Sequence, residues 1–286
     1  MAGEPTDRDV RTRPSAVLRD LAPRAVSGAA LAVVAVGATW WGAVPFALLV
    51  GAVALIMSWE WSRIVRGAAN DRVFLVHVIA VAVAVVLTAR GMPAQALAAC
   101  VAGAIGVQLL ARTPHLALSS LGVLYAGLPA IALIWLRGYN SLGALAILFV
   151  FATVWTTDTF AYLCGRLIGG PKLWPAMSPG KTWSGTAGGI VFAGLAGALF
   201  SVFLLQQPPL VPAVVAVVLS IVSQAGDLAE SGLKRAFSIK NASELIPGHG
   251  GFMDRMDGAV TAAIVAAVIA VVRDPAFPAQ SLLLWS

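Results

Sequence analysis

Residues 25–59, AVSGAALAVVAVGATWWGAVPFALLVGAVALIMSW, contain no Asp, Glu, Lys or Arg. A helix of about 20 apolar residues is enough to cross the roughly 30 Å hydrocarbon core of a bilayer. The run is too long for a single crossing. It therefore predicts two membrane-spanning helices that are separated near Trp41–Gly42.

The composition of the whole chain agrees with this reading. Of its 286 residues, 59% are hydrophobic and only 11% are charged, whereas a soluble domain carries about 25% charged residues. Low charge and high hydrophobicity also exclude disorder. The net charge of +6 comes without a dense patch of Lys and Arg, which argues against a nucleic-acid-binding protein. Two cysteines in apolar runs form no disulfide framework. The chain is predicted to be an integral membrane protein.

Further charge-free runs predict one helix each at 73–89, 91–111, 113–136 and 138–157. Residues 182–226 predict two helices that break at Gln206–Pro209, because paired prolines cannot continue a helix. The last run, 258–272, is short for a crossing, so it is expected to begin inside the protein or in thinned bilayer. The predicted fold class is all-α, a polytopic bundle of about nine transmembrane helices. A β-barrel is not favoured, because the runs lack period-two alternation.

Basic residues predict the orientation and the organisation of the chain. With nine spans, only Arg90, Arg137 and Arg273 of the 19 Lys and Arg residues fall on the side opposite the N-terminus. This bias places the N-terminus in the cytoplasm. We expect a cytoplasmic tail at 1–24, five helices within 25–137, and a C-terminal transmembrane region at 138–286. Its cytoplasmic loops are 165–184 and 230–257.

Acidic residues occur where the predicted helices meet the cytoplasmic side. An acid at the bilayer centre costs about 2.5–3.5 kcal/mol on insertion scales. Asp158 nonetheless ends the sixth predicted span, and Asp227 and Glu230 share one face near the end of the eighth. Such acids either orient helices through buried hydrogen bonds or line a functional cavity.

The densest polar constellation is residues 226–257, GDLAESGLKRAFSIKNASELIPGHGGFMDRMD. Carboxylates without paired Cys or His are hard oxygen ligands that suit Mg²⁺ better than zinc. The Lys and Arg residues beside them suit a ligand that carries several phosphate charges. Glycines around His249 let backbone N–H groups approach a ligand closely. The mixture predicts a metal–polyphosphate site.

A second polar segment, residues 178–185 (SPGKTWSG), precedes the seventh predicted helix. Ser178, Lys181 and Thr182 are positioned to hold phosphate oxygens at that helix N-terminus. The spacing is not that of a Walker A loop. Alternatively, Lys and Trp at a membrane edge serve only as interfacial anchors.

Residues 231–257 resemble the signature of the phosphatidate cytidylyltransferase family, also called CDP-diacylglycerol synthases. That signature reads Ser-x-apolar-Lys-Arg-x4-Lys-Asp-x-small-x2-apolar-Pro/Gly-x-His-Gly-Gly-apolar-x-Asp-Arg-apolar-Asp. The chain follows it with one departure, Asn241 in place of Asp. Gly180 and Ser184 also differ from the Lys and Glu expected there. The loss of the carboxylate at Asn241 weakens activity if that group positions the metal, whereas Asn substitutes well if it only caps a turn.

The resemblance implies a polytopic enzyme that joins CTP to phosphatidic acid in the bilayer and releases pyrophosphate, with Mg²⁺ as cofactor and a second cation conceivable. It implies a bacterial inner membrane, a site that faces the cytoplasm, and no nucleic-acid partner. The roles that we assign on this basis are metal binding by Asp227, Asp254 and Asp257; catalysis by Asp227, Asp254, Lys234, Arg235 and His249; and substrate binding by Asp158, Ser178, Lys181, Thr182, Glu230, Lys240 and Arg255.

Three other functions stay open at the level of the sequence. A proton-coupled transporter is compatible with intramembrane acids and many helices, but it predicts acids on both sides of the bilayer. A CTP-using lipid kinase and a polyprenyl-phosphate transferase use similar groups. The oligomeric state is also open, and a homodimer is compatible with the sequence.

Overall fold

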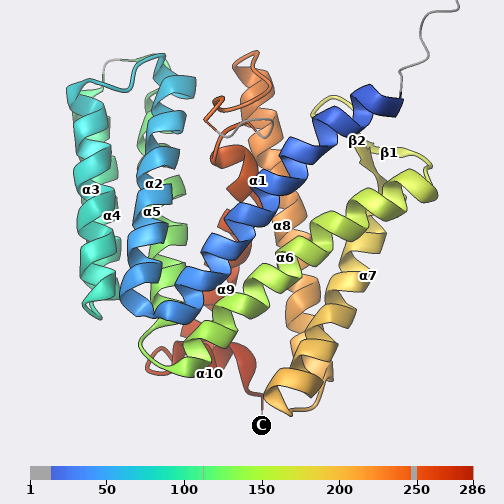
Figure 1. Cartoon of the computed structure of the whole chain (residues 1–286). Coiled ribbons are helices and arrows are strands. Elements are labelled where there is room, and N and C mark those ends of the chain that lie inside the picture. The colour runs from blue at the N-terminus through green and yellow to red at the C-terminus, as the bar shows by residue number, and fades with distance from the viewer. Residues whose placement is uncertain (1–13, 112, 246–249, 286) are drawn as a thin grey trace, which may run out of the picture.

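The structure, a computed structural model, describes residues 14–111, 113–245 and 250–285, with side chains from Val26 onward. Most of the described chain is helical (Figure 1). Its helices are α1 (Pro14–Trp41), α2 (Ala43–Arg66), α3 (Arg72–Ala89), α4 (Pro93–Leu110), α5 (Leu116–Arg137), α6 (Ser141–Leu167), α7 (Trp183–Phe200), α8 (Leu210–Ala236), α9 (Met253–Arg273) and α10 (Pro278–Leu283). A short antiparallel hairpin, β1 (Lys172–Trp174) and β2 (Ser178–Thr182), precedes α7, and a π-helical turn, η1 (Ser201–Leu205), extends it. The predicted all-α membrane bundle is confirmed.

Within the described residues, eight helices, α2 to α9, are long and apolar enough to cross a membrane. The first predicted span corresponds to the shorter apolar part of α1, Val26–Trp41. The breaks fall where the sequence placed them. Gly42 separates α1 from α2 with a φ of 141°, a conformation that favours glycine, and α8 begins directly after Gln206–Pro209.

Several helices extend beyond the charge-free runs. α6 continues past Asp158, α8 continues past Asp227 and Glu230, and α9 begins at Met253 rather than at residue 258. Charged side chains ended the predicted spans, but a helix continues through them when hydrogen bonds and ion pairs compensate the charges. The loop predicted at 230–257 is therefore reduced to residues 237–252, and α9 is 21 residues long.

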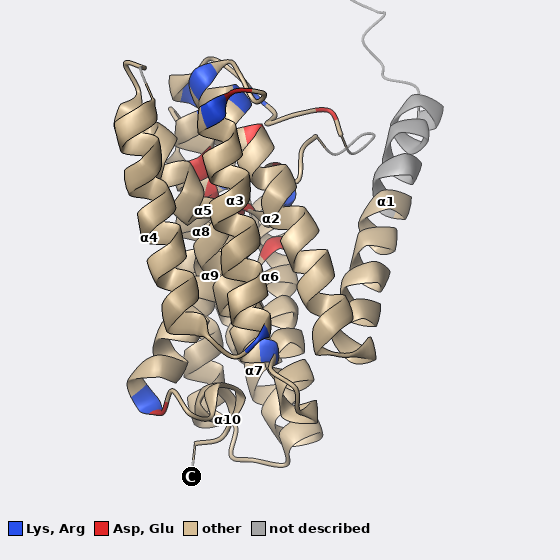
Figure 2. Ribbon diagram, turned by 90° about the vertical axis from the view of Figure 1, so that its left-hand side faces the viewer, with Lys and Arg blue, Asp and Glu red and all other residues tan. Residues whose placement is uncertain are grey.

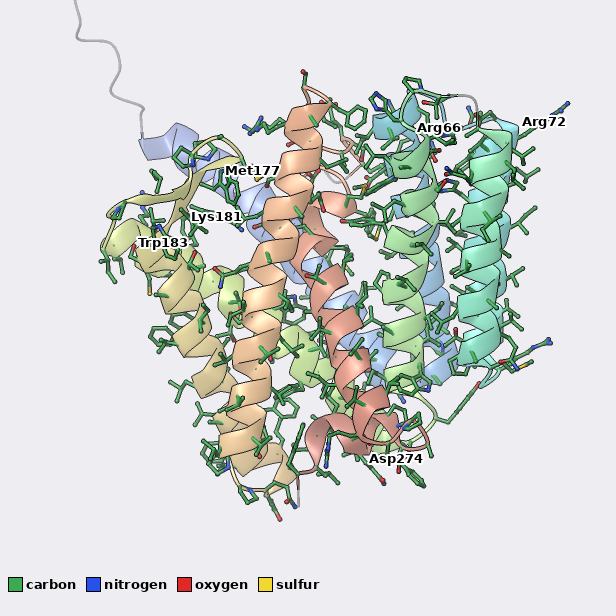
Figure 3. The ribbon with its side chains drawn as sticks, turned by 180° about the vertical axis from the view of Figure 1, so that it is seen from behind. Arg66, Arg72, Met177, Lys181, Trp183 and Asp274 are labelled. Atoms are coloured by element: carbon green, nitrogen blue, oxygen red, sulfur yellow. The ribbon has the colours of Figure 1, made fainter. Side chains whose placement is uncertain are left out.

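The helix α9 lies in the middle of the bundle and contacts α5, α6 and α8. Helices α2 to α5 form one side, α7 and α8 the other, and α1 and α6 run obliquely across them (Figure 1). Lys and Arg gather at one end of the bundle (Figure 2). Arg66, Arg72 and Lys181 lie at this end, and Asp274 lies at the opposite one (Figure 3). We call the end with Arg66, Arg72 and Lys181 the basic end.

Candidate active site

The polar residues of the predicted constellation lie on α8 and α9, toward the basic end. These two helices pack side by side. The C-terminal part of α8 carries Asp227, Glu230 and Lys234. The N-terminal part of α9 carries Asp254 and Asp257. The sequence separates the two groups by a long segment, and the fold brings them together.

Two glycines let the backbones of α8 and α9 approach closely. A Cβ atom added to Gly226 would lie 2.9 Å from the carbonyl oxygen of Asp257 and would collide with the Thr261 side chain. A Cβ added to Gly258 would collide with the Ser223 hydroxyl. Because Gly226 precedes Asp227 and Gly258 follows Asp257, this crossing places the two aspartates at the same level of the bundle.

Substitution of Gly226 by Ala should separate the two helices. We expect the variant to lose about 1–3 kcal/mol of stability, as is typical of overpacking, and to lose activity with it. The midpoint of thermal unfolding in detergent measures the first effect. Gly37→Ala is the matched control, because Gly37 is also helical and a Cβ there meets nothing within 4 Å. Equal stability of the two variants would contradict the close crossing.

A chain of polar contacts links α5, α8 and α9. The Tyr125 hydroxyl donates to Glu230 Oε2 at 2.8 Å. Lys234 Nζ lies 3.1 Å from Glu230 Oε1 and 2.5 Å from Asp254 Oδ1. Glu230 is only 3% exposed, so its charge needs these partners. Lys234 thus bridges two carboxylates on neighbouring helices.

The second carboxylate oxygen of Asp254 organises the loop that precedes α9. Asp254 Oδ2 accepts hydrogen bonds from the backbone N–H groups of Ala242, at 2.9 Å, and Gly251, at 2.8 Å. Gly250 has a φ of 81°, and a Cβ there would lie 2.7 Å from the same oxygen. The glycines here were predicted to let backbone N–H groups approach a ligand closely; in the described structure the N–H of Gly251 contacts the Asp254 side chain.

The β1–β2 hairpin covers the side of α8 near the basic end. Lys181 Nζ on β2 lies 2.6 Å from Asp227 Oδ2 and donates to the carbonyl oxygen of Gln224 at 3.4 Å. Met177, in the turn of the hairpin, lies against Gly232, where an added Cβ would be 3.1 Å from the methionine Cε. Figure 3 shows Met177 and Lys181 beside α8, with Trp183 on the outer side of α7. The polar segment 178–185 therefore contacts the constellation 226–257 through the Lys181–Asp227 ion pair.

A largely apolar cavity of about 410 Å³ adjoins these groups. Its wall is built from α1, α2, α5, α6 and α9 and includes Ala35, Val50 and Ala130. The charged side chains that line it are Asp158 on α6 and Arg255 on α9. The cavity thus combines an apolar interior with an acid and a base, a combination suited to a molecule that has apolar chains and a charged group.

Negative charge is concentrated around Asp257. Asp227, Glu230 and Asp158 all lie close enough to interact with it electrostatically. In the part of the chain that the structure describes, no three Asp, Glu, His or Cys side chains converge as a metal site. Mg²⁺ is usually held by one or two carboxylates, with waters and substrate phosphates as the remaining ligands. The donors present fit that mode of binding and do not form a complete protein cage.

The model of the cytidylyltransferase family matches residues 22–272 of this sequence. The chain belongs to this family. A protein of Brucella abortus biovar 1 (strain 9-941) named "Phosphatidate cytidylyltransferase" is 40% identical over 250 residues, which cover 86% of this chain and 92% of the relative. Proteins of the same name from Staphylococcus saprophyticus and Bacillus subtilis are 40% identical over 138 residues and 38% identical over 139 residues. Each match covers 48% of this chain and 52% of the relative.

Membership of the cytidylyltransferase family makes this chain an enzyme and a transferase, and it confirms the resemblance that the signature residues indicated. The comparisons do not favour a transporter, a lipid kinase or a polyprenyl-phosphate transferase.

Some predicted site residues lie beside the cluster without joining its contacts. Thr182 is buried, and its Oγ1 accepts from the backbone N–H of Gly185 at 3.1 Å, so it caps α7. Ser178 lies at the start of β2. Arg235 and Lys240 are exposed near the end of α8. Their roles stay predictions, and His249 falls outside the described residues.

Two residues of the site, one partly buried and one fully buried, were not among the candidates. Tyr125 on α5 holds Glu230, and Glu60 on α2 holds the loop before α9. Glu60 follows the charge-free run 25–59 directly and stands between two tryptophans. The sequence signal for Glu60 was an isolated acid at a membrane edge. The neighbouring residues did not indicate that it binds Phe252 and Met253, almost 200 residues away.

Proposed function

We propose that this member of the family joins CTP to phosphatidic acid, forming CDP-diacylglycerol and pyrophosphate. One observation carries the proposal. The carboxylates of α8 and α9, with Lys234 on α8 and Lys181 on β2, lie next to an apolar cavity whose lining includes Asp158 and Arg255. A site for a nucleoside triphosphate needs the carboxylates and lysines. A site for a lipid phosphate needs charged groups next to an apolar cavity. A membrane-spanning cytidylyltransferase offers them in one place.

The reaction needs little proton chemistry from the protein. A phosphate monoester such as that of phosphorylated side chains has a second pKa of about 6, so the lipid phosphate is already substantially ionised at neutral pH. Its oxygen attacks the α-phosphorus of CTP, a P–O bond forms, and the bond from the α-phosphorus to the bridging oxygen breaks to release pyrophosphate. The task of the protein is to bring two anions together and to neutralise their charge.

The basic side chains are assigned by their place. Arg255 lines the cavity and is proposed to bind the lipid phosphate at its charged end, with the acyl chains against the apolar wall. Lys181 and Lys234 lie against Asp227 and Asp254 and are proposed to bind the triphosphate. Each of these lysines can then exchange part of its contact with a carboxylate for a phosphate oxygen.

Asp227 is proposed to hold Mg²⁺ together with Asp254 or Asp257. When bound, Mg²⁺ supplies charge neutralisation to the triphosphate and to the departing pyrophosphate. The pair of Asp227 with Asp257 is supported by the glycine crossing, and the pair with Asp254 by the family signature. The basic end is proposed to face the cytoplasm of a bacterial cell, as the distribution of Lys and Arg favours.

The decisive experiment supplies detergent-solubilised protein with labelled CTP, phosphatidic acid and Mg²⁺. A labelled CDP-lipid with release of pyrophosphate is the expected result. A phosphorylated lipid would instead identify a kinase, and absence of turnover with phosphatidic acid of several acyl lengths would contradict the proposal. Light scattering on the same sample measures the particle mass, because a homodimer is so far only a prediction.

The cavity makes a separate prediction for the lipid substrate. Ala35 on α1 lines it, whereas Val33 on the same helix is 71% exposed and does not. Ala35→Trp should fill part of the cavity and raise the KM for phosphatidic acid about 5- to 20-fold, with the KM for CTP unchanged. Val33→Trp should alter neither. Equal kinetics of the two variants would place the acyl chains elsewhere.

A further inference from the structure

Glu60 on α2 is fully buried at the start of α9. Its Oε2 accepts a hydrogen bond from the Met253 N–H at 2.7 Å, and its Oε1 accepts one from the Phe252 N–H at 3.0 Å. Oε1 also accepts a hydrogen bond from the Ser243 hydroxyl. All three donors belong to the loop between α8 and α9 or to the first residue of α9. One side chain from the N-terminal half therefore holds the signature loop at two points.

Burial of a carboxylate is costly unless its charge is compensated. Among the described residues, the ion pairs involve Asp71, Asp227, Glu230 and Asp254, and none involves Glu60. Its compensation comes from the three donors and from the N-terminus of α9, where unpaired N–H groups favour a negative charge. The N-cap residue of α9, Phe252, provides no side-chain cap. Glu60 thus caps the N-terminus of α9 from another helix.

This cap fixes where α9 begins and how its first turn is oriented. Met253, which it binds, is followed directly by Asp254 and Arg255. Glu60 is packed tightly against the loop. A Cβ added to Gly251 would collide with Glu60 Oε1 and lie 2.9 Å from the Ser243 hydroxyl. A small displacement of Glu60 would therefore move the groups proposed to bind the metal and the phosphates.

We propose that Glu60 is a positioning residue for nucleotide binding, which sets the first turn of α9 through the Ser243, Phe252 and Met253 donors. The inference rests on the proposed function for its substrate. It assigns to the N-terminal half of the chain a direct part in the geometry of the site, although all the signature residues come from the C-terminal half.

The test compares Glu60→Gln with wild type and with Glu244→Gln. Glu244 is exposed in the same loop, and no hydrogen bond or ion pair of its side chain is found in the described structure, so it controls for the loss of one carboxylate. For Glu60→Gln we expect the KM for CTP to rise and kcat/KM for CTP to fall about 10- to 100-fold. The KM for phosphatidic acid should rise as well, but by a smaller factor, because Arg255, proposed to bind the lipid phosphate, lies in the same turn of α9. Glu244→Gln should behave as wild type.

A measurement without turnover accompanies the kinetics. Cleavage after the exposed Lys240 by a lysine-specific protease should be several-fold faster in Glu60→Gln than in either reference protein, because the loop has lost its charged anchor. Ser243→Ala removes one donor and keeps the carboxylate. It should show the same pattern at about 3- to 10-fold, and it tests the proposal even if Glu60→Gln fails to fold.

The results separate three cases. A fall in kcat alone, with both KM values and the cleavage rate unchanged, would reduce Glu60 to a stabilising residue and overturn the inference. Activity of Glu60→Gln and Ser243→Ala equal to wild type would also overturn it. If wild type itself makes no CDP-lipid, the proposed function fails instead. That result is recognised in the reference protein before any variant is compared.

Discussion

Asp227→Asn should abolish the formation of CDP-diacylglycerol, with a loss of about 10³-fold or more, while the protein still inserts and folds. The substitution keeps the shape of the side chain but removes the charge that Lys181 faces at 2.6 Å. It also removes a hard anionic ligand from the proposed Mg²⁺ site, where electrostatic groups typically contribute losses of about 10²–10³-fold each. Turnover of labelled CTP with phosphatidic acid measures the loss.

Asp254→Asn should be equally inactive for a partly different reason. Asp254 faces Lys234 and also accepts two backbone N–H groups of the loop, so its substitution disturbs the loop as well as the charge. Asp274→Asn at the opposite end of the bundle is the control (Figure 3) and should retain full activity. Near-normal turnover of both the Asp227 and the Asp254 variants would refute the metal role.

The fold could be predicted from the sequence because the bilayer imposes a single strong rule on composition. Long charge-free runs give the order and approximate positions of the long helices, and Gly42 and the Gln206–Pro209 segment give the breaks. The rule fails at the ends, where α9 begins at Met253 instead of residue 258. The extra residues include the charged Asp254, Arg255 and Asp257, and this first part of α9 is held by Glu60 and Lys234, which are distant in sequence. The short α10 and the β1–β2 hairpin were not predicted, because the rule applies only to runs long enough to cross a bilayer.

The site was predictable where spacing and residue type carry the information. Asp227 and Glu230 share a helix face, and the Gly-rich loop leads into Asp254, so the sequence predicted that these charged groups lie at one end of the bundle. It gave no partners for these groups. The Lys234 bridge and the Glu60 cap depend on which helices pack together, and a single sequence does not contain that information.

Lys234→Met should unfold or severely destabilise the protein, by about 3–5 kcal/mol, because it leaves the buried Glu230 and Asp254 without their shared cation. Lys172→Met, at an exposed position of β1, should be neutral and controls for the loss of one lysine. The double variant Glu230→Gln/Lys234→Met removes one of the two uncompensated charges and should recover a large part of that stability, measured as the midpoint of thermal unfolding in detergent.

Activity separates the two roles of Lys234. If it only neutralises carboxylates, the double variant should regain turnover in proportion to its folded fraction. If it also binds the triphosphate, as proposed, the stabilised double variant should remain at least about 10²-fold less active than wild type, with the deficit largest at low CTP concentration. The second outcome is expected, because Lys234 Nζ lies 2.5 Å from Asp254, a residue that we propose as a ligand of Mg²⁺. A double variant that is both stable and fully active would remove Lys234 from the nucleotide site and leave it as a structural bridge between α8 and α9.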